Sequence, residues 1–128
     1  MTRGIALVLA VALAAPMHAA AEKNPVPIEE WEVPYPDSRP RDPDAVSASE
    51  VWFVGQVGDY LARLNPQTGD FRRHEFDSDV GPHNLIVGED GIVWYAGNLQ
   101  GYIGRYNPAT EEVTRIEMPD PGAVDPHT

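Results

Sequence analysis

Two histidines that each follow a proline are the residues of this sequence best suited to chemistry. His83 stands in Gly81-Pro82-His83-Asn84, and His127 stands in Asp125-Pro126-His127-Thr128. Histidine titrates near neutral pH, so it can act as a general base, a ligand or a substrate contact. Asn84 and Asp42 stand beside the histidine positions of this recurring motif. We treat all four residues as candidates for contacting a bound substrate.

A structural role is the alternative for these histidines. The ring of each one would then hydrogen-bond a loop carbonyl of the next repeat of the chain. An earlier copy of the motif reads Pro40-Arg41-Asp42, with no histidine. The fold itself therefore does not require histidine at this place, and both interpretations stay open.

Other catalytic and metal-binding patterns are missing from the sequence. It contains no cysteine, no glycine-rich phosphate loop, and no GxSxG or HExxH motif. Asp42 and Asp44 lie close together, but they lack the ligand spacing of a Ca²⁺ loop. We therefore predict no catalytic residue, no metal site and no cofactor within this chain.

The elements that must position the histidines come from an internal repeat with an offset of 42 residues. The segment 51–76 returns as 93–118, and ten of its 26 positions are identical, too many for a chance likeness. The shared positions include the Val-Trp pair that opens each copy and a later Asn-Pro turn. A period of this size is typical of a repeat architecture.

Each repeat divides into four short β segments, which are clearest in the second copy. There we expect strands at 84–87, 92–96, 102–106 and 112–118. Asp90-Gly91 is a strong hairpin signal between the first two, and Asn107-Pro108 opens the turn between the last two. The equivalent first strand of the first copy is degraded. Four antiparallel strands per repeat predict an all-β fold, the β-propeller.

The repeat gives a prediction for the whole chain. We expect a signal peptide at 1–21, a Pro-rich segment at 22–39 with an outer, ring-closing strand at 28–33, blade 1 at 40–78, blade 2 at 79–121, and the start of a third blade at 122–128. Propellers contain about 4–8 blades. Two blades and one stray strand therefore predict the N-terminal fragment of a longer propeller.

The first 21 residues have the three parts of a secretory signal peptide. Arg3 supplies the positive start, 5–15 is an apolar run, and Ala19-Ala20-Ala21 fits a small-residue cleavage site. The apolar run is shorter than the roughly 20 residues that a membrane span needs. We expect export to the periplasm or the medium, with cleavage near Ala21 and no membrane attachment afterwards.

The charge of the chain limits its partners. Twenty acidic residues against nine basic ones give a net charge of −11. This balance argues against binding to nucleic acid or to anionic membrane surfaces. Solubility is the simplest explanation of the acidity, and an acidic cation site is the sharper alternative.

Several repeated residues are expected to build the core. Trp52 and Trp94 are predicted to pack between sheets, since aromatic side chains bury large areas. Gly97 and Gly104 are predicted to allow close approach to the backbone. His74, whose counterpart in the second copy is Ile116, is expected on the surface.

The repeated motifs resemble those of the virginiamycin B lyase and streptogramin lyase-like β-propeller family. The likeness covers 40–128 and rests on Val-Trp followed by Phe or Tyr, on Tyr102-Ile103-Gly104-Arg105-Tyr106-Asn107-Pro108, and on Gly-Pro-His-Asn followed by Asp-Gly. The resemblance implies seven blades. For the complete protein it implies a carbon–oxygen lyase that opens an ester ring by elimination, with Mg²⁺. The family's catalytic His and metal-binding Glu lie in late blades, and no position here matches them.

Three functional interpretations follow. The first is an exported streptogramin lyase-like propeller, with His83 and His127 as substrate contacts. The second is a non-catalytic propeller that holds a small molecule, a peptide, a sugar or a partner protein at its channel. The third is a truncated product with no activity of its own, because two blades alone expose unpaired strand edges.

Overall fold

The computed structural model of this chain describes residues 26–77 and 79–127, so the predicted signal peptide at 1–21 lies outside the described residues. The described part contains eight strands and one short 3₁₀ helix. None of its helices is long and apolar enough to cross a membrane. The class is all-β, as predicted.

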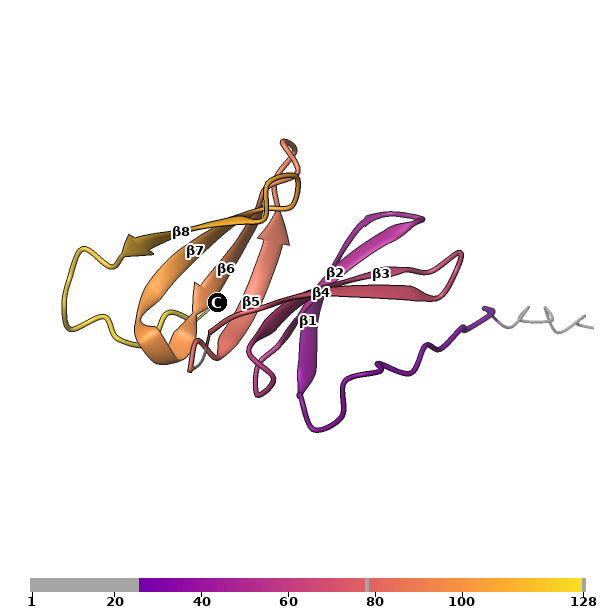
Figure 1. Cartoon of the computed structure of the whole chain (residues 1–128), viewed down its shortest axis with the longest axis horizontal. Helices are drawn as coiled ribbons and strands as arrows, with labels where there is room; N and C mark the ends of the chain where they lie inside the picture. The colour runs from indigo at the N-terminus through magenta and orange to yellow at the C-terminus, as the bar shows by residue number, and fades with distance from the viewer. Residues whose placement is uncertain (1–25, 78, 128) are drawn as a thin grey trace, which may run out of the picture.

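The strands form two four-stranded antiparallel sheets, and each sheet follows chain order. The first contains β1 (Pro40–Ser47), β2 (Glu50–Gly55), β3 (Tyr60–Asn65) and β4 (Asp70–Glu75). The second contains β5 (Pro82–Val87), β6 (Val93–Gly97), β7 (Tyr102–Asn107) and β8 (Glu112–Glu117), with the 3₁₀ helix η1 (Asn98–Gln100) before β7. Figure 1 shows the sheets side by side. The strands of the second sheet begin and end within two residues of their predicted bounds.

The first strands of the two sheets, β1 and β5, share an irregularity near their starts. The register of β1 against β2 shifts between Arg41 and Asp44, and that of β5 against β6 shifts between Pro82 and Leu85. Bulges of this kind bend a strand and redirect its side chains. Pro43 falls inside the first shift, where its missing N–H interrupts no regular ladder. β1 therefore forms even though its sequence is poor in strand-forming residues.

The main core lies between the two sheets. The first sheet contributes Trp52, Val54 and Leu61; the second contributes Leu85, Val93, Tyr95, Tyr102 and Tyr106. The predicted core position of Trp52 is confirmed, since it is 5% exposed and its ring lies 6.1 Å from that of Tyr106. The prediction that His74 lies on the surface is wrong. Its ring packs 4.5 Å from Tyr106, at the junction of the sheets.

The opposite face of the first sheet is covered by the N-terminal segment. Trp31, Val33 and Tyr35 pack on the cluster made by Phe53, Tyr60, Ala62 and Leu64. The prediction of a strand at 28–33 is not met, because these residues have no regular structure. They lie on a sheet face, which presents side chains, whereas a strand requires an edge with free N–H and C=O groups.

The outer face of the second sheet carries the residues equivalent to those of the first-sheet face that packs against the second sheet. Trp94, Ala96 and Ile103 stand where Trp52, Val54 and Leu61 stand one repeat earlier. Trp94 was predicted in the core, but it is only half-buried, as is Ile103. No other sheet of the described residues packs on this face, which leaves an apolar hollow of about 210 Å³.

Candidate functional site

The candidate site forms where the starts of β1 and β5 meet. The strands are tied together by a hydrogen bond in which the backbone N–H of Val87 donates to Asp44 Oδ2 at 2.8 Å. The irregular stretches near their starts carry Asp42 on β1 and His83 on β5. Asp42 also has a left-handed φ of 50°, which turns its carboxylate out of the regular strand pattern. The bulges therefore place an acid and an imidazole from neighbouring sheets side by side.

His83 is the most unusual side chain of the site. It is only 7% exposed, and its Nδ1 lies 3.7 Å from Asp42 Oδ2, which is too long for a hydrogen bond. Nδ1 has no hydrogen-bond partner among the described residues. Buried polar atoms are nearly always hydrogen-bonded. Nδ1 therefore does not make the loop-carbonyl bond that a purely structural role would give it. The atom is enclosed by the protein, so it gains a partner only if Asp42 or the His83 ring shifts.

His127 lies directly against His83. The two ring centroids are 3.8 Å apart at an interplanar angle of 42°. Asn98, on η1, fixes the segment that carries His127. Its Nδ2 donates to the Asp125 carboxylate and, at 3.2 Å, to the carbonyl of Pro126. One buried amide thus docks the C-terminal segment onto the second sheet.

The electrostatics keep His83 neutral. Burial lowers the pKa of His83 below its ordinary value of 6.5, and the nearby charges of Arg41 and His127 lower it further. Asp42 acts in the opposite direction, but its Oδ2 is already bound by Arg41 Nε at 2.8 Å. A neutral imidazole has one nitrogen with a lone pair, so His83 can accept a proton or a hydrogen bond.

Asn84, the fourth predicted residue, is placed differently. Its Oδ1 accepts a hydrogen bond from the backbone N–H of Leu85 at 2.7 Å. It lines the apolar hollow on the second sheet, together with His127 and Trp94. The structure thus brings Asp42, His83 and His127 together and sets Asn84 beside them. That all four face the channel of a ring stays a prediction.

Sequence reasoning did not single out two residues that shape the site, Arg41 and Asn98. Arg41 holds Asp42 and also donates from Nη1 to Gln56 Oε1 at 3.1 Å. Gln56 and Asn98 are equivalent in the repeat, and each follows the glycine that ends the second strand of its sheet. The recurrence of an amide side chain directly after this glycine is the sequence signal that could have identified Asn98.

The site does not form a metal centre in the described residues. Across 26–77 and 79–127 no group of three or more His, Asp or Glu side chains is arranged to hold an ion. What the site offers is a neutral imidazole, a neighbouring carboxylate and a second imidazole, next to an apolar hollow. Such a set can bind polar groups of a ligand and accept a proton from one.

The architecture defines the class of protein. Two four-stranded antiparallel sheets, each in chain order, repeat at 42 residues and pack face against face with their first strands adjacent. These are features of consecutive blades of a β-propeller.

Solved structures lead from this class to a particular family. The chain is similar to selenomethionine-substituted virginiamycin B lyase from Staphylococcus aureus, with 26% identity over 73% of this chain and a TM-score of 0.64. A catalytically inactive variant of virginiamycin B lyase from S. aureus, solved with quinupristin, matches at 25% identity over 75% of the chain, with a TM-score of 0.65. A streptogramin B lyase structure matches at 26% identity over 75%, with a TM-score of 0.67. These likenesses relate the chain to the virginiamycin B lyase-like β-propeller family.

The match extends over only part of these relatives. The chain spans about a third of their length, 31% of the first and 32% of each of the other two. No protein-family model and no curated protein matches the chain.

Proposed function

We propose that the two blades belong to an exported propeller ring of the streptogramin lyase kind, and that His83 contacts a ligand at the mouth of its channel. The observation that carries this is the buried Nδ1 of His83, which has no hydrogen-bond partner in the described residues. It lies where two innermost strands start, beside Asp42 and His127. Ligand pockets often form where separate structural units meet, because both units can contribute side chains.

The half-buried face of the second blade supports the ring. Its residues Trp94 and Ile103 are equivalent to Trp52 and Leu61 of the first blade. The second blade packs on Trp52 and Leu61, which are 5% and 0% exposed. An identical packing of a further blade would bury the Trp94 face in the same way. Burial of apolar area at about 25 cal/mol per Å² makes this addition favourable.

The ligand we propose is a small molecule, a peptide or a sugar, and the first candidate is a cyclic depsipeptide antibiotic. One of the similar structures is described with quinupristin, so this compound is a rational probe. His83 and Asp42 would take its polar groups.

Carbon–oxygen elimination is the second candidate function, favoured by the relationship to lyases. The described residues do not supply a site for the Mg²⁺ that the family implies, and we derive no step through the ion. Lyase activity is therefore proposed for the complete ring, with His83 as a ligand contact.

Calorimetry and mass spectrometry on the purified protein test both functions. We expect saturable heat on titration with quinupristin, and a loss of binding of about tenfold in His83→Gln, as one polar contact to a buried group is worth about 1–2 kcal/mol. His74→Gln is the matched control and should bind normally. Elimination opens the ring without changing the mass, whereas hydrolysis adds one water. Absence of heat in the wild-type protein, or equal binding by His83→Gln, would contradict the proposal.

A further inference from the structure

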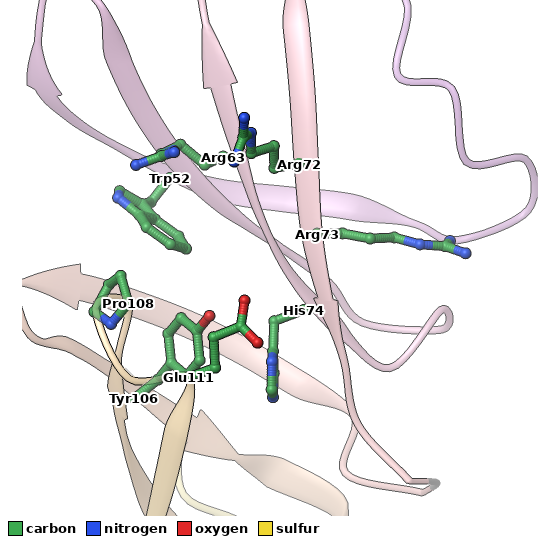
Figure 2. Close-up of a pocket in the computed structure, with 8 residues that line it drawn as sticks. All are labelled: Trp52, Arg63, Arg72, Arg73, His74, Tyr106, Pro108 and Glu111. Carbon is green, nitrogen blue, oxygen red and sulfur yellow. The ribbon is translucent and has the colours of Figure 1, made fainter.

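A second cavity lies between the blades, away from the His83 site. It has a volume of about 340 Å³, and Figure 2 shows the side chains around it. Those that matter here are Trp52, Arg63, Arg72, His74, Tyr106 and Glu111. Tyr106 pairs with Val93 at the start of β6, while Pro82, next to His83, pairs with Gly97 at its end. The cavity and the His83 site are therefore near opposite ends of the strands.

One wall of the cavity contains two arginines in an unfavourable arrangement. Arg63 on β3 and Arg72 on β4 are directly paired across the two strands. Like charges in directly opposite positions destabilise a sheet. The second blade avoids this conflict, because the equivalent pair is Arg105 and Thr114. Arg72 therefore has no counterpart arginine in the second blade.

The charge of only one of these arginines is compensated. Glu50 Oε1 accepts a hydrogen bond from Trp52 Nε1 at 2.7 Å and lies 3.5 Å from Arg63 Nη1. Glu50 thus holds Trp52 and Arg63 in place. Arg72 is exposed and has no ion pair in the described part of the chain. An oxyanion between Arg63 and Arg72 would satisfy the fork-shaped donors of both.

The opposite wall of the cavity contains a residue in an unfavourable backbone conformation. Glu111, in the turn between β7 and β8, has a φ of +59°, and its equivalent in the first blade is Gly69, with a φ of +75°. Glycine adopts this left-handed conformation without steric cost, whereas glutamate does not. In Figure 2 the Glu111 carboxylate points into the cavity next to the Tyr106 hydroxyl. Departures of this kind from local preference are typical of functional sites.

We propose that this cavity binds a hydroxyl-bearing organic acid, of which a hexuronate is the simplest example. The carboxylate of the ligand lies between Arg63 and Arg72. Its hydroxyl groups donate to Glu111, and its less polar face packs on the edges of Trp52 and Tyr106. Glu111 repels a bare inorganic anion, so it selects an acid that carries hydroxyl groups. Neither the His83 site nor lyase chemistry is needed for this binding.

Nuclear magnetic resonance on the ¹⁵N-labelled full chain tests the proposal with glucuronate as the probe. We expect saturable shifts of the Trp52 indole N–H and of the arginine side-chain N–H signals. Glucose should produce none at the same concentrations, and sulfate should bind more weakly than glucuronate. Arg72→Thr, which copies the second blade, should weaken glucuronate binding about tenfold or more, because charge-assisted hydrogen bonds are lost. The matched control is Arg115→Thr, which removes one arginine from β8 and should leave the affinity unchanged.

The two walls of the cavity can be tested separately. Glu111→Gly should weaken glucuronate binding but strengthen sulfate binding, since the repulsive carboxylate is gone. Both Arg72→Thr and Glu111→Gly should unfold at higher temperature than the wild-type protein without ligand, because each removes a local conflict. Failure of glucuronate to shift Trp52, equal affinity in Arg72→Thr, or tighter binding of sulfate than of glucuronate by the wild-type protein would overturn the proposal.

Discussion

Replacing Gly104 by alanine tests the packing that joins the blades. Gly104 is paired directly with Tyr95, and a Cβ added at Gly104 would lie 2.0 Å from Cζ of the Tyr95 ring. The ring is 2% exposed, its hydroxyl lies 3.1 Å from that of Tyr102 and its centroid lies 4.9 Å from that of Phe76, so moving the ring would disturb both contacts. Overpacking of a core costs about 1–3 kcal/mol. Loss of the hydroxyl contact adds about 1 kcal/mol. We expect Gly104→Ala to lower the free energy of unfolding by about 2–4 kcal/mol.

The assay is urea denaturation followed by intrinsic fluorescence, arranged as a double-mutant cycle with Tyr95→Ala. Tyr95→Ala removes the ring atoms that the new Cβ would meet. Gly104→Ala should then cost less than about 1 kcal/mol in that background. The first sheet already has Ala62 opposite Phe53 at the equivalent pair, which shows that this strand position accepts alanine. An equal cost of Gly104→Ala with and without the Tyr95 ring would refute the steric explanation.

Three further predictions concern the His83 site and the N-terminus. Burial lowers the folded pKa of His83 below the unfolded value of 6.5, so its contribution to stability is complete above pH 6.5 and is lost as the pH falls below that value. The wild-type urea midpoint should therefore drop more than that of His83→Gln between pH 7.5 and 5.5, with a slope of at most about 1.4 kcal/mol per pH unit; parallel curves would exclude this. Asn98→Ala should release the segment that carries His127 and raise the pKa of His83, as measured by proton NMR; an unchanged titration would show that the amide does not position His127. Mass spectrometry of the exported protein should find an N-terminus just after Ala21; a product that retains the first 21 residues would contradict cleavage there.

The blades were predicted well because three of the four strands recur in both copies of the repeat. The repeated Val-Trp pairs and Asn-Pro turns indicate four strands per copy, and the structure has those of the second copy within two residues of their predicted bounds. Such alternation and turn chemistry act locally, so they are visible without knowledge of the tertiary fold. The close approach predicted at Gly104 is confirmed, since the ring of its paired residue Tyr95 fills the space that a Cβ would occupy.

Features that depend on contacts between distant segments could not be predicted in this way. The pattern of 28–33 resembles a strand, but whether it pairs depends on an edge supplied by other residues. His74 appeared to be a surface residue because its own strand is outermost, yet the neighbouring blade brings Tyr106 against it. The contact between Asp42 and His83 likewise depends on bulges in two strands, and bulges leave little trace in sequence.

The most direct test of the ligand site proposed at His83 is the imidazole signal of that residue during titration with quinupristin. In protein labelled with ¹⁵N at histidine, the His83 ring nitrogens should shift as the ligand saturates the site, because Nδ1 gains the partner that it lacks. The His74 signals should stay in place. A His83 signal that does not move while quinupristin binds elsewhere, or does not bind at all, would contradict the proposed site.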